Sequence, residues 1–383
     1  MSGGSEETTR LFFAGDVMTG RGVDQIREVS AGEGLREPHV DSARLYVDIA
    51  EKKHGPIPAP VGPEYSWGDG LEVFEQFDPA VRIVNLETSI TTGDDYWEGK
   101  SIHYRMHPAN VDTLQAAGID ICSVANNHVL DFGRSGLVET LEVLEGANVE
   151  FVGAGRDLEE AQRPVQRELP GGARLLVWAF AMPSSGVPRS WRATPSRPGL
   201  WLVDELSVRA ARAITDRVQA HKRAGDIAVI SVHWGSNWGW EIPPAQQALA
   251  ERLVDGGVDI IHGHSSHHLR PIEVRDEALI MHGCGDLITD YEGIGGHQRW
   301  RGELGAMFFA DVAPKGGAVQ QLRLVPTTMR KMKLRRAGRE DAEWLERTLN
   351  RISEPFETTF ELNDDGIIAL QGGRNDGDEA GIG

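Results

Sequence analysis

The alternation of short apolar runs with amphipathic helical segments constrains the fold more than any other feature of the sequence. Helical patterns lie at 206–223 and 243–257, between runs of strand length. Those apolar runs occupy 9–17, 80–88, 173–181, 226–235 and 258–264. Alternation of this kind is typical of an α/β domain. With 383 residues, the chain has room for one large domain or two ordinary ones.

Two long segments interrupt the alternation, and the pattern changes near the C-terminus. Residues 25–70 and 183–199 contain proline- and glycine-rich stretches, so we predict long loops there that serve a site or are mobile. We expect a core domain over 8–330, a C-terminal extension over 331–370 that packs on or beside it, and a disordered tail over 371–383. Within the extension, a helical pattern precedes a hairpin pattern whose turn is "NDDG".

The charge balance narrows the class of partner. The formal net charge is −19 and the sequence pI is near 5.1. Such a surface repels phosphate backbones, so we expect no nucleic-acid partner. An anionic substrate would bind only where cations or metal ions reverse the local field.

The sequence also predicts a cellular location. The two cysteines, Cys122 and Cys284, lie in or beside apolar runs and make no disulfide framework, which fits a reducing compartment. The segment "MSGGSEETTR" has neither a basic start nor an apolar stretch, so we predict no signal peptide. No apolar run approaches the roughly 20 residues of a membrane span. We therefore expect a cytoplasmic protein without a membrane span.

Metal-ligand residue types follow five predicted strands. They are Asp16; Asn85 and Glu87; Asn126, Asn127 and His128; His233; and His262, His264, His267 and His268. Each group alone has a simpler interpretation, such as a turn cap or a buried histidine of the core. Because ligands bind beyond the carboxyl ends of strands, we expect all five groups to converge at one sheet edge. Carboxylates, imidazoles and an amide oxygen suit two transition metal ions, so their ordered coincidence favours a metal site.

Several motifs together resemble the CapA family, which is named for poly-γ-glutamate capsule synthesis and is similar to calcineurin-like metallophosphoesterases. They are "GDVMTGR", "NLET", "ANNHVLDFG", "HWGSNWGWEIPPAQQALAERLVDGGVDIIHGHSSHHLRPIE" and "GCGDLITDYEGI". The resemblance covers about residues 10–330. It implies an α/β fold of the four-layer αββα sandwich type, with two divalent metal ions, Mn, Fe or Zn, at the strand ends.

The resemblance also implies roles for the first four motif positions. Asp16 would bind the first metal and Glu87 would bridge both. Asn127 and His233 would bind the second metal. His128 would be a general acid or a transition-state stabiliser rather than a ligand.

The histidine-rich motif departs from the family pattern. Its imidazoles are three residues apart, which favours His264 and His267 as ligands and leaves His262 and His268 as possible substitutes. The histidine of the family's usual Asp-x-His start is missing here, because Met18 occupies its position. The first metal is therefore expected to lack one protein ligand.

Residues around these motifs are candidates for binding substrate. Arg21, expected to act with His128 as a catalytic residue, could clamp an anion because its fork suits carboxylate or phosphate, or it could form a salt bridge. Arg105 has the same two readings. Trp234 and Trp238 could wall a substrate pocket or pack as a hydrophobic lid. Asp286 follows another strand, where it could bind substrate or orient a ligand histidine.

These features predict a metal-dependent hydrolase that uses a metal-bound hydroxide on a phosphoester or a γ-glutamyl-type amide. One alternative is a non-catalytic metal-binding accessory protein of poly-γ-glutamate synthesis or export. Another is a γ-glutamyl transfer or tailoring enzyme of a soluble pathway. The expected partner is an anionic small molecule or a γ-glutamyl substrate. The sequence leaves the oligomeric state open, with a homodimer as one alternative.

Overall fold

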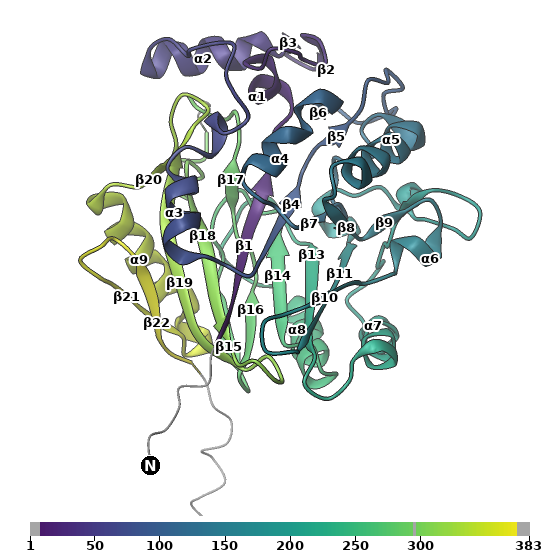
Figure 1. The fold of residues 1–383 in the computed structure, drawn as a ribbon, viewed down its shortest axis with the longest axis vertical. Helices are drawn as coiled ribbons and strands as arrows, with labels where there is room; N and C mark the ends of the chain where they lie inside the picture. Colours follow the sequence, from purple (N-terminus) through teal and green to yellow (C-terminus); the bar gives the residue numbers. More distant parts are fainter. Residues whose placement is uncertain (1–7, 294–295, 374–383) are drawn as a thin grey trace, which may run out of the picture.

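The computed structural model describes residues 8–293 and 296–373, which form a mixed α/β fold (Figure 1). The larger sheet has ten strands in this described part. In spatial order eight of them are β21 (Thr359–Leu362), β22 (Ile368–Gly372), β19 (Val319–Met329), β18 (Leu304–Val312), β1 (Thr9–Val17), β4 (Val81–Leu86), β7 (Ile121–Ser123) and β8 (Glu150–Val152). Two more pair at the side of this path: β17 (Asp286–Ile288) with β1, and β20 (Leu334–Arg336) with β19.

A second sheet of six strands lies beside the first. Its order is β10 (Val165–Glu168), β11 (Arg174–Ala181), β13 (Ile227–His233), β14 (Ile260–His264), β16 (Ala278–Met281) and β15 (Ile272–Arg275). Short two-stranded pairs are formed by β2 (Gly34–Glu37) with β3 (Val40–Ser42), β5 (Ser89–Ile90) with β6 (Arg105–Met106), and β9 (Ala154–Gly155) with β12 (Gly199–Leu200). The α-helices of the described ranges are α1 (Arg21–Gln25), α2 (Arg44–His54), α3 (Gly70–Phe77), α4 (Asp112–Ala116), α5 (Gly133–Gly146), α6 (Leu158–Ala161), α7 (Val208–His221), α8 (Pro244–Asp255) and α9 (Arg339–Ser353).

Successive residues of β1 face different neighbours because side chains alternate along a strand. Phe12 packs edge-to-face on Phe74 of α3, with ring centroids 4.7 Å apart. Phe13 packs against His262 of β14, with centroids 5.3 Å apart. The larger sheet therefore has a helix on one face and the second sheet on the other.

The second sheet shows the same alternation on β11. Val177 belongs to the hydrophobic core shared with the larger sheet, whereas Trp178 belongs to a separate core with residues of α7 and α8. In Figure 1, α7 and α8 lie at the lower right beside this sheet, and α3 lies on the left. The second sheet is thus covered by the larger sheet on one side and by α7 and α8 on the other.

The predicted elements agree with the structure over most of the core. The helices predicted at 206–223 and 243–257 are α7 and α8, and the expected C-terminal helix and hairpin are α9 with β21 and β22. Because β20 and β22 pair with β19, the extension continues the larger sheet. The tail expected over 371–383 lies outside the described residues from 374 onward, and β22 runs to Gly372.

Two expectations were wrong. The segment 25–70, predicted as a long loop, contains the β2–β3 pair and α2, which lie at the top of the view in Figure 1. The five polar groups do not share one sheet edge. Those at 16, 85–87 and 126–128 lie at or just after the ends of strands of the larger sheet, whereas His233 and His264 end strands of the second sheet. The site is built where the two sheets meet.

None of the helices within residues 8–293 and 296–373 combines the length and the apolar composition that crossing a membrane requires.

Candidate metal centre

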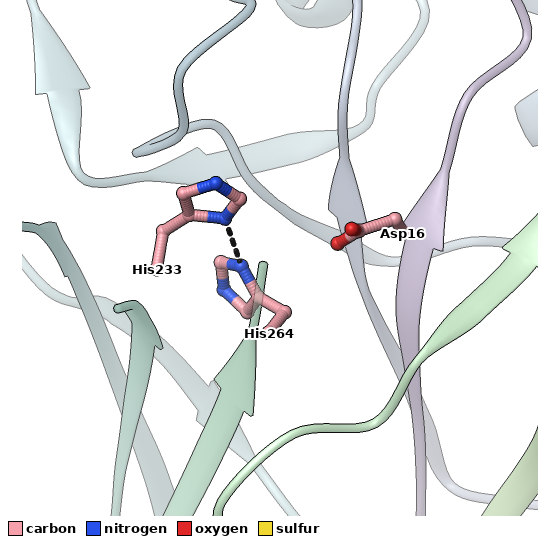
Figure 2. A group of neighbouring side chains, drawn as sticks. All are labelled: Asp16, His233 and His264. Carbon is pink, nitrogen blue, oxygen red and sulfur yellow. Dashed lines mark hydrogen bonds between the residues drawn. The ribbon is translucent and has the colours of Figure 1, made fainter. Parts of the chain in front are cut away.

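Strand pairing places acidic and imidazole ligands at neighbouring strand ends. On the larger sheet, Asp16 of β1 pairs in register with Asp286 of β17. On the second sheet, His233 of β13 pairs in register with His264 of β14. Figure 2 shows the Asp16 carboxylate turned toward these two imidazoles. Residues far apart in the chain thus meet at one point between the sheets.

Two groups of side chains at this point have the geometry of a metal site. The first comprises Asp16, His233 and His264, and the second comprises Asp16, His267 and Asp286. Within each group, one potential ligand atom from every residue lies within 4.8 Å of the others. Asp16 is common to both groups. This arrangement suits two cations side by side, with carboxylate and imidazole ligands.

Three carboxylates are buried at the centre: Asp16, Glu87 and Asp286. Asp16 Oδ1 accepts a hydrogen bond of 2.7 Å from Asn85 Nδ2, but Asp16 Oδ2 and Asp286 Oδ2 have no hydrogen-bond partner among the described residues. Burial raises the pKa of Asp16 to about 6. Burial and the charges of Asp16 and Asp286 raise the pKa of Glu87 well above its ordinary value. Buried charges of one sign are costly, so orphaned oxygens here fit a site for cations.

His233 and His264 are held as neutral imidazoles, the form that binds metals. Burial lowers the pKa of each ring well below its ordinary value. Their Nδ1 atoms lie 2.7 Å apart, and His233 Nε2 lies 3.1 Å from Asn127 Oδ1. The structure therefore brings His264 beside His233, which with Asn127 was expected to bind the second metal.

His267 belongs with Asp16 and Asp286 to the second ligand group. Its Nδ1 is 3.0 Å from Asp286 Oδ1, and its Nε2 is 3.1 Å from Asn237 Nδ2. Burial lowers the pKa of His267, but the charge and hydrogen bond of Asp286 outweigh it, so the pKa is raised. Asp286, expected to bind substrate or orient a histidine, is thus also a candidate ligand.

His128 borders the site as part of a hydrogen-bonded network. Its Nδ1 is 2.7 Å from Asp131 Oδ2, and its Nε2 is 3.9 Å from Glu87 Oε1. Lys100 Nζ contacts Asp131 and lies 3.0 Å from His128 Nδ1. Burial raises the pKa of Asp131 to about 6 and lowers that of His128 well below its ordinary value. Asp131 and Lys100 thus both contact Nδ1, and Nε2 is the ring atom on the side of Glu87.

Sequence reasoning missed Asp131 and Lys100. Asp131 lies three residues after His128 in the motif "ANNHVLDFG", so that spacing was available as a signal. Lys100 lies in "WEGKSIHYR", which has no pattern that marks a site.

The other two histidines of the cluster have both ring nitrogens engaged by the protein. His262 lies 2.8 Å from the Ala14 carbonyl and 3.1 Å from Ser231 Oγ. His268 lies 2.9 Å from the Leu269 carbonyl, and its Nε2 accepts from Gly239 N. Neither belongs to a candidate ligand group of the described residues, so the structure gives no support to them as substitute ligands.

Of the two readings of Arg21, the structure shows the salt bridge. Its guanidinium forms a two-point ion pair with Asp290 and also donates to Glu37 and to the Tyr46 hydroxyl. The side chain is buried, with an exposed fraction of 2%. The fork is fully used inside the protein, so Arg21 stabilises the fold around the site.

Arg105 is likewise engaged. Its Nη1 donates to the Gly93 carbonyl and to Asp94, and its Nη2 donates to the Ala31 carbonyl. These bonds fasten three loop segments together. They match the salt-bridge reading of Arg105, and its role toward substrate stays a prediction.

The two tryptophans of the 234–240 loop have different surroundings. Trp234 is buried in the core and donates its indole N–H to the His282 carbonyl, which matches the packed alternative rather than a pocket wall. Trp238 is half-buried and stacks on His297, with ring centroids 4.0 Å apart. It also lies 5.6 Å from the ring of His267. Trp238 therefore borders the candidate site, and its role toward substrate stays a prediction.

Comparisons with known proteins agree with the motif resemblance. The family model described as "Bacterial capsule synthesis protein PGA_cap" matches residues 10–291. A "Probable polyglutamine synthesis accessory protein" of Mycobacterium tuberculosis is 43% identical over 368 residues, covering 96% of this chain and 97% of the relative.

Two named CapA proteins are more distant. The "PGA biosynthesis protein CapA" of Bacillus subtilis is 26% identical over 75% of this chain and 64% of its own length. The "Capsule biosynthesis protein CapA" of Bacillus anthracis is 29% identical over 50% of this chain and 45% of its own length. The family match and the full-length similarity show that the chain belongs to the CapA family of bacterial capsule synthesis proteins.

Proposed function

We propose that the chain is a metal-dependent hydrolase that acts on a phosphoester or a γ-glutamyl-type amide. The observation that carries the proposal is the pair of ligand groups that share Asp16, with buried carboxylate oxygens that lack partners among the described residues. The helix–sheet–sheet–helix order of the core supports a four-layer sandwich of metallophosphoesterase type. Fold alone does not fix the reaction, so the site carries the argument.

The first cation would be held by Asp16, His267 and Asp286. Met18 stands where the family has a ligand histidine, which leaves one ligand position of the first cation open. Asp286 would fill that position with its carboxylate, since β17 brings it into register with Asp16. Glu87 belongs to neither ligand group of the described residues, and its role as a bridge rests on the family resemblance. This set fits because it offers two carboxylates and one imidazole at one buried point.

The second cation would be held by Asn127, His233 and His264, of which His233 lies within hydrogen-bonding distance of the other two. When bound, divalent cations here would activate water and stabilise negative charge that develops on the substrate. We leave the metal open among Mn, Fe and Zn, because imidazole and carboxylate ligands suit all three.

His128 would transfer or share a proton at Nε2, the ring atom that faces Glu87. Asp131 and Lys100 fix the ring through their contacts with Nδ1, and Lys100 neutralises Asp131. This network lies beside the candidate ligands and contributes none of them. It supports a reaction rather than a purely structural site.

The substrate class rests on the electrophiles that such a site serves and on the relatives' names, which refer to polyglutamine, PGA and capsule synthesis. The "accessory protein" in one name favours a second candidate function, a metal-binding accessory of a polymer-synthesis complex. A γ-glutamyl transfer enzyme would use the same groups. The cytoplasmic location and the oligomeric state stay predictions.

Turnover of defined substrates tests the proposal. Protein reconstituted with Mn²⁺, Fe²⁺ or Zn²⁺ would be assayed on a nitrophenyl phosphodiester and on a γ-glutamyl anilide. We expect activity that falls by about 10²–10⁴-fold in His128→Asn, with the metal content unchanged. His221→Asn on α7 is the control outside the site and should match the wild type. Loaded protein that turns over neither substrate class would favour the accessory role.

A further inference from the structure

A chain of buried hydrogen bonds lies behind the candidate ligands and links the two sheets. His262 Nε2 is 2.8 Å from the carbonyl oxygen of Ala14, and His262 Nδ1 is 3.1 Å from Ser231 Oγ. The same hydroxyl is 2.9 Å from His264 Nε2. His262, Ser231 and His264 are all buried. We call this chain, from Ala14 through His262 and Ser231 to His264, the relay.

The Ala14 carbonyl, at the start of the relay, determines which atom donates in each of its hydrogen bonds. A carbonyl oxygen only accepts, so His262 Nε2 carries the hydrogen. Within the described residues, the ring nitrogens of His262 meet this carbonyl and one hydroxyl but no carboxylate. A buried imidazolium without an anionic partner is costly, so the ring is neutral and Nδ1 is an acceptor.

The remaining bonds follow from the single hydrogen of a hydroxyl group. Ser231 donates that hydrogen to His262 Nδ1. Its oxygen therefore accepts the hydrogen of His264 Nε2. A neutral His264 with its hydrogen on Nε2 has a lone pair on Nδ1, and Nδ1 is the atom that faces His233 in the ligand group.

We infer that His262 and Ser231 are positioning residues that hold His264 in the tautomer whose Nδ1 can bind a divalent cation. The inference rests on the proposed function in one respect, namely that His264 is a ligand. It explains why a third buried histidine stands two residues before His264 without joining a ligand group of the described chain. Partners of this kind fix the ring orientation and tautomer of metal-binding histidines in other sites.

The anchor of the relay is the strand that carries Asp16. Pairing between β1 and β4 passes from Ala14–Val84 directly to Asp16–Asn85, so Gly15 is skipped in the register. The bond from His262 to Ala14 therefore ties β14 to the irregular end of β1. It fixes the spacing between ligands that come from different sheets.

The tautomer of His264 is the direct test and needs no metal. The protein would be labelled with ¹⁵N-histidine, stripped with EDTA, and studied by long-range ¹H–¹⁵N NMR at neutral pH, with His264→Asn identifying the His264 signals. We expect one Nε2–H tautomer for His264 and the same tautomer for His262. A His264 ring with its hydrogen on Nδ1, or averaged between both nitrogens, would overturn the relay.

Metal affinity tests the consequence. Zn²⁺ affinity would be measured by competition with a fluorescent chelator, with thermal unfolding as the check on folding. We expect His262→Phe to bind about 10- to 100-fold more weakly. His262→Gln should recover most of this loss because its amide both donates and accepts. His282→Phe is the matched control, since His282 is buried on the neighbouring segment but outside the relay.

The outcomes separate this inference from the proposed function. If the wild type binds Zn²⁺ and His262→Phe binds it equally well, the relay is overturned and the hydrolase proposal stands. If the wild type binds no divalent cation, both fail. Should His262→Phe not fold, Ser231→Ala replaces it, and an affinity equal to that of the wild type would again overturn the relay.

Discussion

The strongest prediction concerns the free energy of folding that is lost when the buried carboxylates of Asp16, Glu87 and Asp286 lie together without a cation. Asp16→Asn should stabilise the metal-free protein at neutral and alkaline pH, although it alters a candidate ligand. The substitution keeps an oxygen that can accept the bond from Asn85 Nδ2. It removes the negative charge that lies beside Glu87 and Asp286. The negative charge of Asp16 therefore lowers the stability of the metal-free fold, although the proposed function needs that charge to bind metal.

The pKa of Asp16 gives the magnitude and its pH dependence. Burial raises this pKa from 3.8 to about 6, so the folded protein holds the proton more tightly than the unfolded chain. The resulting stability is fully present below about pH 4 and is lost as the pH rises through 6. A rise of this size corresponds to about 3 kcal/mol. Asp16→Asn should therefore be more stable than the metal-free wild type by up to about 3 kcal/mol at pH 8, and close to it at pH 4.

Urea unfolding of EDTA-treated protein across this pH range measures the effect. The matched control is Asp311→Asn, because Asp311 is also buried but is paired with Arg10 and Arg323. The control should be destabilised, since its two arginines lose their partner. If Asp16→Asn is destabilised at pH 8 as the control is, the carboxylates are not strained in the absence of metal and the reasoning is wrong.

Two further predictions concern the frame of the site. Gly15→Ala should unfold at lower urea and lose metal, because a Cβ there would lie 1.8 Å from the Gly285 carbonyl oxygen; normal stability with bound metal would contradict the tight strand contact. Arg21→Met should cost about 3–5 kcal/mol in unfolding free energy by leaving Asp290 buried without its partner, while metal stoichiometry in the remaining folded protein stays as in the wild type. A loss of substrate affinity without a loss of stability would instead restore the anion-clamp role of Arg21.

Much of the site could be predicted because its ligands lie at strand ends. The apolar runs mark the strands by length and pattern, and the residue types that follow them are visible directly. Asp16, His233 and His264 were found in this way, and the structure brings them together. The order of motifs then identified the family, which the comparisons show.

The pairing of strands was beyond the same reasoning. An apolar run shows that a strand exists but not which strand lies beside it. The strands of two sheets were therefore predicted to end at one edge of a single sheet. The register of β1 with β17 joins Asp16 to Asp286 across most of the chain, and no local pattern encodes it.

Side-chain partners that are distant in sequence explain why the roles of Arg21, Trp234 and Lys100 could not be decided from the sequence. Arg21 meets Asp290 only after the chain has folded, so its sequence context resembled that of a free anion clamp. Trp234 lies in a glycine-containing loop, yet its indole is covered and bonded to a backbone carbonyl. Lys100 reaches His128 and Asp131 from a segment without regular structure, where no spacing rule applies.

The central claim is a site for two divalent cations, and metal content tests it most directly. Purified protein would be analysed by elemental mass spectrometry after reconstitution with Mn²⁺, Fe²⁺ or Zn²⁺, with Glu87→Gln beside the wild type. We predict near two equivalents per chain in the wild type and a clear loss in Glu87→Gln. One equivalent would mean that Asp286 does not complete the first position. No bound metal in the wild type after reconstitution would contradict the account.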